Sequence, residues 1–301
     1  MSENNNFALV SSKYNKVENR TEETKIKKLR DFNNWIKMSL INIFCPINAN
    51  VFDICGGKGG DIRKYRFKKV NNYVLFDNAN LSIEEAKVRV GKLENNIKAK
   101  NYIIETVNCF TEDITQKIPK DLQFDFVSCQ FAIHYAFDNI KHIKRLFKNI
   151  TTRLKEGGIF VGTTVDDKKL FEHLKKSDNL EFGNELYNVR FEQKNNFKTI
   201  GTKYYFTLTE AIPDIPEYLV RFKLFEKVAN KYGLKLLYKK SFKECKETLF
   251  NFAYEYDLNK RVKDTIFNSI KTGYNRIGNI PENQWEICDI YYIFVFEKIK
   301  N

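Results

Sequence analysis

The sequence predicts an α/β fold with a mostly parallel β-sheet. Up to Thr164, short apolar runs typical of buried strands alternate with helical patterns, and this alternation indicates βαβ units. A glycine-rich turn, CGGKGG, directly follows the first of these runs, at the place where such a fold brings its backbone close to a ligand. The chain length of 301 residues fits one domain of this class that carries an inserted lobe.

The first half of the chain supplies most of the expected sheet. Apolar side chains recur at helical spacing over residues 21–44, which predicts a long amphipathic helix that Pro46 ends. The expected strands are residues 51–54, 73–76, 102–107, 124–129 and 159–163, and the expected helices between them are residues 82–97 and 139–154.

After Thr164 the pattern changes. Residues 185–192 and 200–209 are interpreted as strands of an extra hairpin or small lobe, which a helix over residues 217–232 follows. The run IYYIFVFE within residues 287–297 predicts a buried strand that pairs antiparallel with residues 234–239 and closes the sheet. The connection between these two strands, about 45 residues long, must hold helices of its own.

Composition sets limits on location and partners. The net charge of +13 suits a polyanion such as nucleic acid. Only 11 of the 51 basic residues are Arg, however, so lysines spread over a solvated surface explain the charge equally well. Six cysteines lie far apart without a His partner, which predicts buried free thiols and no metal site. Without a secretory signal or an apolar run of membrane-spanning length, the protein is expected inside the cell.

The glycine turn and one acid predict a nucleoside cofactor. Asp77 ends the second expected strand, where a carboxylate can accept hydrogen bonds from both ribose hydroxyls. The turn fits neither the dinucleotide pattern GxGxxG nor a P-loop, since no Lys-Ser or Lys-Thr pair ends it. Nucleotide hydrolysis is therefore disfavoured. The alternative role of Asp77 is that of a capping carboxylate at the end of a strand.

Four segments together resemble a known family. They are the turn with its continuation KGGD, the run FDFVSCQFAIHYAF at residues 124–137, PEYLVRF, and the terminal WE followed by IYYIFVFEK. In this combination the chain resembles the cellular, stand-alone mRNA cap guanine-N7 methyltransferases of eukaryotes over about residues 14–298. The resemblance implies a Rossmann-like class I S-adenosylmethionine-dependent methyltransferase. Its mostly parallel sheet would have a C-terminal antiparallel strand and an inserted β lobe.

The resemblance also implies how the chain is organised and what it acts on. Residues 1–301 would form one domain, with an N-terminal helical segment (1–49), a cofactor-binding half (50–164) and a half that binds the cap and closes the sheet (165–301). The cofactor would be S-adenosylmethionine, the substrate 5′-capped mRNA and the location the nucleus. A monomer is expected, and other capping enzymes or RNA polymerase are conceivable partners.

Two sets of site residues follow from the resemblance. The set matched to the cofactor is Lys37, Cys55, Gly57, Asp77, Asn108, Cys109, Gln130 and Tyr135. The set matched to the cap is Asn33, Asn34, Lys58, Lys64, Arg89, Phe131, His134, Tyr204, Glu217 and Tyr291. Lys58, Lys64 and Arg89 would meet the triphosphate.

Glu217 would accept hydrogen bonds from the ring NH and the exocyclic amine of guanine, and His134 and Tyr291 would help to hold the base. The acceptor nitrogen carries no proton, so positioning rather than a general base is expected to drive the reaction.

Several positions leave other interpretations open. Cys55 stands where the family has glycine, Asn108 and Cys109 where it has Asp and Ser, and Val165 where it has proline. A methyltransferase for another RNA position or a nucleoside, and an RNA-binding relative without turnover, are the two rival functions.

Each matched side chain also has an ordinary structural role. The aromatic residues of the cap set would be core side chains. Lys64 and Arg89 would lie on solvated helix faces. His134 would be a helix-start residue, and Glu217 an acid in the first turn of a helix.

Overall fold

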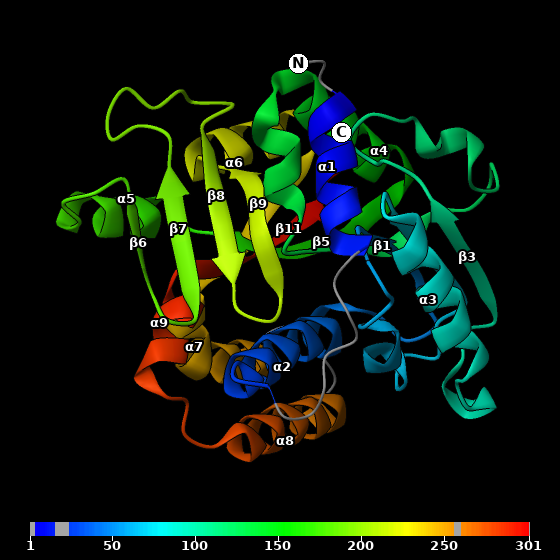
Figure 1. The fold of residues 1–301 in the computed structure, drawn as a ribbon. Coiled ribbons are helices and arrows are strands. Elements are labelled where there is room, and N and C mark those ends of the chain that lie inside the picture. Colours follow the sequence, from blue (N-terminus) through cyan, green and yellow to red (C-terminus); the bar gives the residue numbers. More distant parts are fainter. Residues whose placement is uncertain (1–3, 16–23, 256–259, 301) are drawn as a thin grey trace.

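A seven-stranded sheet forms the centre of the computed structural model, which describes residues 4–15, 24–255 and 260–300 (Figure 1). The strand order is β10-β11-β5-β4-β1-β2-β3. The strands are β1 (Asn50–Ile54), β2 (Asn72–Asp77), β3 (Asn101–Thr106), β4 (Phe124–Gln130), β5 (Leu154–Val165), β10 (Leu234–Ser241) and β11 (Tyr291–Lys298). The five strands β1–β5 run parallel, and β11 lies antiparallel between β5 and β10.

The direction in which successive strands are added reverses between β1 and β4. In open α/β sheets such a reversal opens a crevice at the carboxyl ends of the strands, and ligands bind there. The glycine turn leaves the carboxyl end of β1, so the topology places it at this crevice.

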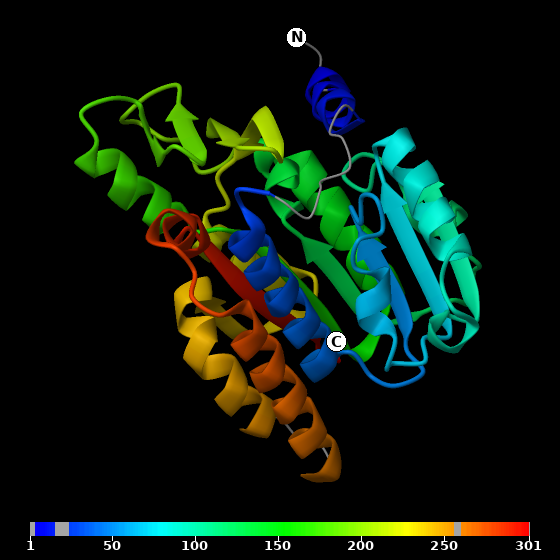
Figure 2. The same cartoon turned by 60° about the horizontal axis from the view of Figure 1, so that its bottom comes forward.

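Helices cover both faces of the central sheet because its strands are apolar on both sides. Tyr73 and Leu75 of β2 face one core, and Val74 and Phe76 face the other. The helices are α1 (Asn4–Asn15), α2 (Lys27–Phe44), α3 (Asn80–Gly91), α4 (Ile140–Arg153), α5 (Asp167–Lys176), α6 (Phe222–Lys231), α7 (Phe242–Glu255), α8 (Lys260–Ile277) and α9 (Glu282–Asp289). Helices α2, α7 and α8 pack together on the first face (Figure 2), whereas α4 and α6 cover the second.

A second sheet of four antiparallel strands forms the inserted lobe. Its strands are β6 (Glu181–Asn184), β7 (Tyr187–Phe191), β8 (Lys203–Leu208) and β9 (Ile212–Tyr218). In Figure 1 the lobe lies beside α1, which also contacts α3 at the far edge of the central sheet. The two outer strands β6 and β9 were not expected from the sequence.

The expected fold class is confirmed, and the closing hairpin forms as predicted, with Leu234 opposite Lys298 and Ser241 opposite Tyr292. Its long connection holds α7, α8 and α9. The helix expected over residues 21–44 is α2, which begins at Lys27; residues 21–23 lie outside the described residues.

The helix expected over residues 217–232 is wrong at its start. Glu217 belongs to strand β9, where it pairs with Tyr204 of β8, and the helix begins only at Phe222. The proposed role of Glu217 as an acid in a first helical turn is therefore wrong too. The pairing of β9 with the lobe outweighs the local sequence preference, as tertiary contacts commonly do.

Short 3-10 helices complete the connections. They are η1 (Ile62–Tyr65), η2 (Asn95–Ile97), η3 (Ile114–Gln116) and η4 (Ile133–Asp138). The cysteines of the chain are free thiols; five are buried, and Cys55 is half-buried. Within the described ranges, none of the helices combines the length and apolarity that a bilayer crossing needs.

Candidate active site

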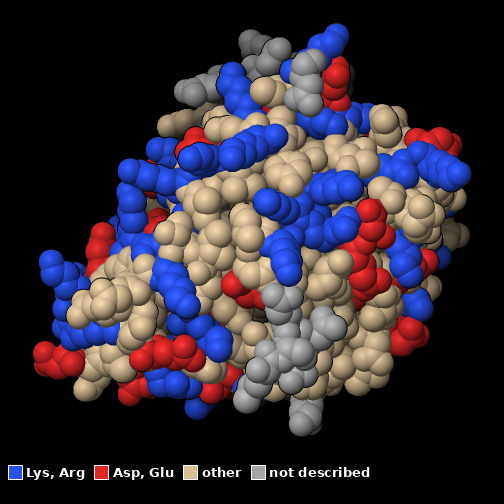
Figure 3. Space-filling model, turned by 90° about the horizontal axis from the view of Figure 1, so that it is seen from above, with Lys and Arg blue, Asp and Glu red and all other residues tan. Residues whose placement is uncertain are grey.

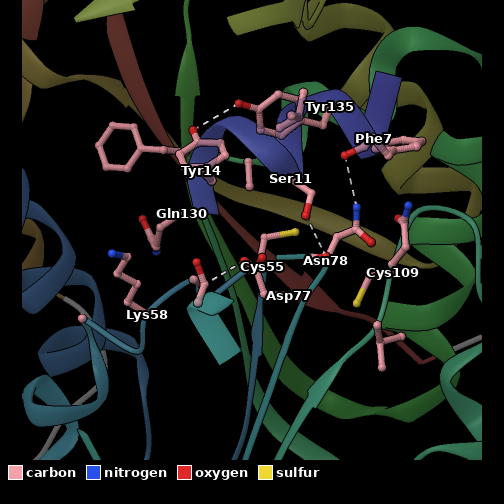
Figure 4. Close-up of a pocket in the computed structure, with 18 of the residues that line it drawn as sticks. Phe7, Ser11, Tyr14, Cys55, Lys58, Asp77, Asn78, Cys109, Gln130 and Tyr135 are labelled. Carbon is pink, nitrogen blue, oxygen red and sulfur yellow. Dashed lines mark hydrogen bonds between the residues drawn. The ribbon is translucent and has the colours of Figure 1, made fainter. Parts of the chain in front are cut away.

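A cavity of about 640 Å³ opens at the crevice, a size typical of small-molecule sites. All eight residues matched to the cofactor line it: Lys37, Cys55, Gly57, Asp77, Asn108, Cys109, Gln130 and Tyr135. Figure 4 shows several of them converging from β1, β2 and β4. Of the cap set, Lys58, Arg89 and Phe131 also line the cavity.

The glycine turn wraps around the carboxylate of Asp77. The Gly57 N–H donates to one carboxylate oxygen at 2.9 Å, and the Ala79 N–H donates to the other at 2.8 Å. Gly57 has a φ of 52°, which favours glycine. A Cβ on Gly56 would lie 2.7 Å from a carbon of Leu75, so this position has room only for glycine. Burial raises the pKa of Asp77, although these backbone bonds oppose the shift.

The position of Asp77 is compatible with both of the roles considered from the sequence. Its carboxylate accepts from the N–H of Ala79, the residue just before α3, and it faces the cavity. A carboxylate offers about four lone-pair sites, so two backbone bonds leave capacity for two ribose hydroxyls.

Two lysines share one carboxylate beneath the turn. The Lys37 and Lys64 ammonium groups lie 2.7 and 2.6 Å from the same oxygen of Asp61. Burial alone would raise the pKa of Asp61, but the two lysines outweigh it and hold this pKa below its usual range. Burial lowers the pKa of Lys64. Lys64 does not line the cavity, so the structure does not bring it to the place expected for the triphosphate.

A second buried acid lies next to this network. The Tyr73 hydroxyl donates to the Asp53 carboxylate at 2.6 Å. Burial, together with the nearby charge of Asp61, raises the pKa of Asp53 to about 7. The floor of the turn is thus a compact set of charged and polar groups that keeps Lys37 in a fixed position at the cavity.

Lys58 and Arg89 form the basic rim of the cavity. The Lys58 ammonium lies 2.7 Å from a carboxylate oxygen of Glu85, and the Arg89 Nε donates to the Lys58 carbonyl at 2.9 Å. Elsewhere, Lys and Arg side chains are scattered over the face seen from above rather than gathered into one track (Figure 3). On that face, net charge alone does not mark a path for a polyanion.

The cavity suits a zwitterionic nucleoside such as S-adenosylmethionine. The buried Gln130 side-chain oxygen has no hydrogen-bond partner among the described residues, and it is an acceptor that fits an ammonium group. Lys37 provides a cation for a carboxylate, and Asp77 provides acceptors for ribose hydroxyls. Val107 and Phe110 provide apolar wall for a purine.

The positions that depart from the family pattern all lie at or near the site. Cys55 adopts a φ of 56°, in the left-handed region that favours glycine. The Asn108 side-chain oxygen accepts a hydrogen bond from the Phe110 N–H at 3.0 Å, so only one of its lone pairs is left for an adenine amine. Val165 is buried opposite Tyr291 in the β5–β11 pair.

Four residues of the cap set form a buried group, here called the Glu217 cluster: His134, Tyr204, Glu217 and Tyr291. The Tyr204 hydroxyl donates to one oxygen of Glu217 at 2.5 Å, and the other oxygen lies 3.5 Å from the His134 Nε2. Neither His134 ring nitrogen has a hydrogen-bond partner among the described residues. These are unsatisfied polar atoms in a place that excludes water.

Burial sets the charge state of this cluster. It raises the pKa of Glu217 to about 7, although the bond from Tyr204 opposes the shift. It lowers the pKa of His134 to about 3, so this imidazole is neutral at pH 7. Hydrogen bonds from N–H donors would stabilise the charged form of this carboxylate. They would bring its pKa back toward the ordinary range.

No member of the Glu217 cluster lines the cavity. Asn33 and Asn34 on α2 do not line it either; Asn33 is half-buried and Asn34 is exposed. Sequence reasoning missed the residues that α1 contributes to the wall, namely Phe7, Val10, Ser11 and Tyr14. The Asn-rich start of the chain carries a weak helical pattern, and the resemblance to the family from about Tyr14 was the available signal.

Comparisons with known proteins show which family the sequence matches. Residues 1–299 match the sequence profile described as mRNA (guanine-N(7))-methyltransferase domain. The chain is 30% identical to mRNA cap guanine-N(7) methyltransferase 1 of Arabidopsis thaliana, over 97% of this chain and 82% of that protein. It is 34% identical to the mRNA cap guanine-N(7) methyltransferase of Schizosaccharomyces pombe, over 91% of this chain and 76% of that protein.

The fold is also similar to that of solved structures. One is an S-adenosylmethionine-dependent methyltransferase from Clostridium acetobutylicum, with a TM-score of 0.52 and 12% identity over 99% of this chain and 100% of that chain. A second is the geranyl diphosphate C-methyltransferase of Streptomyces coelicolor, with a TM-score of 0.52 and 8% identity over 97% of each chain. At these identities the likeness concerns the fold alone.

Proposed function

Because the chain belongs to the mRNA (guanine-N(7))-methyltransferase family, we propose that it methylates N7 of the guanine in the 5′ cap of mRNA, with S-adenosylmethionine as the donor. One arrangement carries this proposal: a cavity lined by all eight residues matched to the cofactor lies next to the buried Glu217 cluster. A methyl donor and an acceptor base can thus be held by two separate sets of side chains.

The cofactor supplies a methyl group on a positively charged sulfur that leaves as a neutral thioether. Lys37 would bind its carboxylate, and the unpartnered oxygen of Gln130 would accept from its ammonium group. Asp77 would accept from the ribose hydroxyls, since its carboxylate faces the cavity from the end of β2. These contacts fix both ends of the molecule, and fixed geometry lowers the barrier for an in-line displacement.

Glu217 would recognise the acceptor base. Guanine offers a ring N–H and an exocyclic amine on one edge, and a carboxylate accepts from both, whereas adenine lacks this pair of donors. Tyr204 holds one carboxylate oxygen in place, so the position of Glu217 is set before the base arrives. As N7 is methylated the ring becomes positively charged, and the nearby carboxylate stabilises that charge in a water-poor site.

The phosphate bridge of the cap would lie along the rim of the cavity. Lys58 and Arg89 line this rim and carry positive charge, and both side chains suit phosphate oxygens. Lys64 has a different role in this proposal, because its ammonium group is paired with Asp61 under the turn. It would help to hold Lys37 in position through their shared carboxylate.

The decisive experiment is mass spectrometry of short capped RNAs incubated with the protein and S-adenosylmethionine. A GpppN-capped RNA should gain one methyl on the terminal base, and an ApppN-capped RNA should gain none. An RNA that already carries N7-methylguanine should not change. A methyl on an internal nucleotide of all three RNAs would favour the rival function, a methyltransferase for another RNA position.

The second rival, an RNA-binding relative without turnover, is separated by calorimetry. An enzyme should show saturable binding of S-adenosylmethionine and of its product, S-adenosylhomocysteine. Lys37→Met is the control for binding at this site: it removes the cation proposed to bind the cofactor's carboxylate, so its affinity for S-adenosylmethionine should be lower. The proposal also carries the expectation that the protein acts in the nucleus, where transcripts are capped.

A further inference from the structure

The segment that leaves the glycine turn buries one row of side chains and exposes another. It consists of the 3-10 helix η1 and the turns that follow it. The buried side chains are spaced by three residues: Ile62, Tyr65 and Lys68. The exposed cations follow them at the same spacing: Arg63, Arg66 and Lys69. Side chains three positions apart in a 3-10 helix lie one above the other, so these cations form a row on the surface.

The exposed row keeps its positive charge available. Residues 62–73 contain five basic residues and no acid. Lys64 is paired with Asp61, and the buried Lys68 ammonium donates to the Asn42 carbonyl at 2.9 Å. Among the described residues, no acid forms an ion pair with a cation of the exposed row. The row can therefore attract an anion without first breaking a salt bridge.

An aromatic ring lies within this row. Phe67 is 64% exposed, and the Arg66 guanidinium lies over its ring, 4.5 Å from the centroid. One face of the ring is thus covered by a cation, and the other is open to water. The exposed Ile47 lies on a neighbouring loop, in which the Asn48 N–H donates to the Lys68 carbonyl at 2.7 Å. Cations beside an open aromatic face are the combination that binds single-stranded nucleic acid.

The row begins at the rim of the cavity. Lys58 and Gly60 line the cavity, and the Lys64 ammonium donates to the Gly60 carbonyl at 3.3 Å. From there η1 runs beside α2 (Figure 2). Phe67 follows Lys58 by nine residues, so the two cannot lie more than about 32 Å apart. One RNA strand can therefore contact both the rim and the row.

We infer that Arg63, Arg66, Phe67 and Lys69, here called the Phe67 surface, bind the single-stranded body of the RNA downstream of its cap. A base stacks on the open face of the Phe67 ring, and the cations contact the phosphates next to it. This inference rests on the proposed function, which makes a capped RNA the substrate. The charge alone would also suit an acidic protein, whereas the open ring face suits a base.

Two substitutions of Phe67 test for stacking. Phe67→Leu keeps an apolar side chain and removes the ring, and Phe67→Trp keeps a ring and is the matched control. Neither changes a core side chain. The probe is a 3′-labelled RNA of about 15 nucleotides with a 5′ hydroxyl, which lacks the cap and its phosphates. Fluorescence anisotropy should show binding about tenfold weaker in Phe67→Leu and nearly unchanged in Phe67→Trp.

Two double variants test for phosphate contacts. Arg63→Gln with Lys69→Gln removes two charges from the Phe67 surface. Lys227→Gln with Lys231→Gln removes two exposed charges from α6, on the opposite face of the sheet, and is the matched control. Each phosphate contact with a single strand contributes about 0.7 to the slope of log affinity against log salt concentration. The first pair should therefore reduce this slope by about 1.4, and the α6 pair should leave it unchanged.

Methyl-transfer kinetics separate the Phe67 surface from the cap site. Phe67→Leu should raise KM about tenfold for a capped RNA of about 15 nucleotides and leave kcat unchanged. Its kinetics with the dinucleotide GpppG should equal those of the unaltered protein. An equal loss with GpppG would overturn the inference, and so would full RNA affinity in Phe67→Leu or equal salt slopes in the two double variants. Binding of polyglutamate that depends on Phe67, with RNA binding unaffected, would assign the surface to an acidic protein instead.

Failure of this inference is distinguishable from failure of the proposed function. Normal methyl transfer, with equal RNA binding in all variants, overturns the Phe67 surface alone. If the protein transfers no methyl group to capped RNA but the variants weaken RNA binding as expected, the proposed function fails and the RNA site remains.

Discussion

The Tyr204 hydroxyl donates a 2.5 Å hydrogen bond to the Glu217 carboxylate, and the two residues are direct partners in the register of β8 and β9. Strand pairing therefore sets this bond, without help from a loop. It fixes one carboxylate oxygen and leaves the other 3.5 Å from the His134 Nε2. The carboxylate is thus positioned by its partners on β8 and η4.

Glu217→Gln should abolish most methyl transfer and leave cofactor binding intact. The amide replaces one acceptor oxygen by a donor and removes the negative charge that would stabilise the methylated ring. Loss of one such preorganised group costs about 10²–10³-fold in turnover. Single-turnover assays measure the transfer rate, and calorimetry measures the dissociation constant of S-adenosylmethionine, which should change by no more than about twofold.

Tyr205→Phe is the matched control for that variant. Tyr205 lies next to Tyr204 on β8, but its hydroxyl bonds to Glu192 at the surface. This control should transfer methyl groups at the unaltered rate. Parallel losses of transfer and of cofactor affinity in Glu217→Gln would contradict the role given to Glu217.

The same substitution should stabilise the fold at high pH. Burial raises the pKa of Glu217 from 4.5 to about 7, so between these values the folded state holds a proton that the unfolded state has released. Stability due to this group therefore falls as pH rises from 4.5 to 7. Glu217→Gln removes this ionisation. At pH 8 the free energy of unfolding of the variant should therefore exceed that of the unaltered protein by about 3 kcal/mol.

Denaturant unfolding at pH 5 and pH 8 checks this expectation, because the advantage should fall below about 1 kcal/mol at pH 5. Glu192→Gln changes an exposed acid of the same lobe and should show the same small difference at both values. An advantage of Glu217→Gln that does not vary with pH would show that Glu217 titrates normally.

Much of the fold could be predicted because buried parallel strands leave a strong local pattern. The runs that became β1, β2 and β4 are apolar on both faces, and the alternation with helices indicates their parallel order. The place of Asp77 at the cavity could be predicted from its position at the end of a strand. The closing hairpin of β10 and β11 followed from one long apolar run near the C-terminus.

Other features depend on partners that the local sequence does not reveal. PEYLVRF resembles a helix start, yet Glu217 lies in a strand because β8 pairs with it. Helix α1 has little apolar periodicity, and its position depends on Phe7 docking against Phe110. By contrast, the ion pair between Lys64 and Asp61 could have been predicted from the sequence, because the two residues are three positions apart.

Cys55→Gly should stabilise the turn relative to Cys55→Ala. Cys55 has a φ of 56°, where a side chain with a Cβ is strained and glycine is not. The left-handed conformation costs a residue other than glycine about 1 kcal/mol or more. Both variants lose the same sulfur, so their difference isolates the backbone effect. Unfolding in urea should give the glycine variant an advantage of about 1 kcal/mol, and an equal or lower stability would contradict the strain.

Asp61→Asn should destabilise the fold, and Lys64→Met should restore much of the loss in the double variant. Asp61 is shared by Lys37 and Lys64, whose side chains are only 17% and 13% exposed, so removing the acid leaves two neighbouring cations without it. Breaking such a buried group costs about 3 kcal/mol or more. Because the lysines hold the pKa of Asp61 below its usual range, its contribution is present above about pH 4 and falls as the medium becomes more acidic. A double-mutant cycle from denaturant unfolding at pH 7 measures the coupling. If the losses of the two single variants simply add, then Lys64 does not depend on Asp61 for its place under the turn.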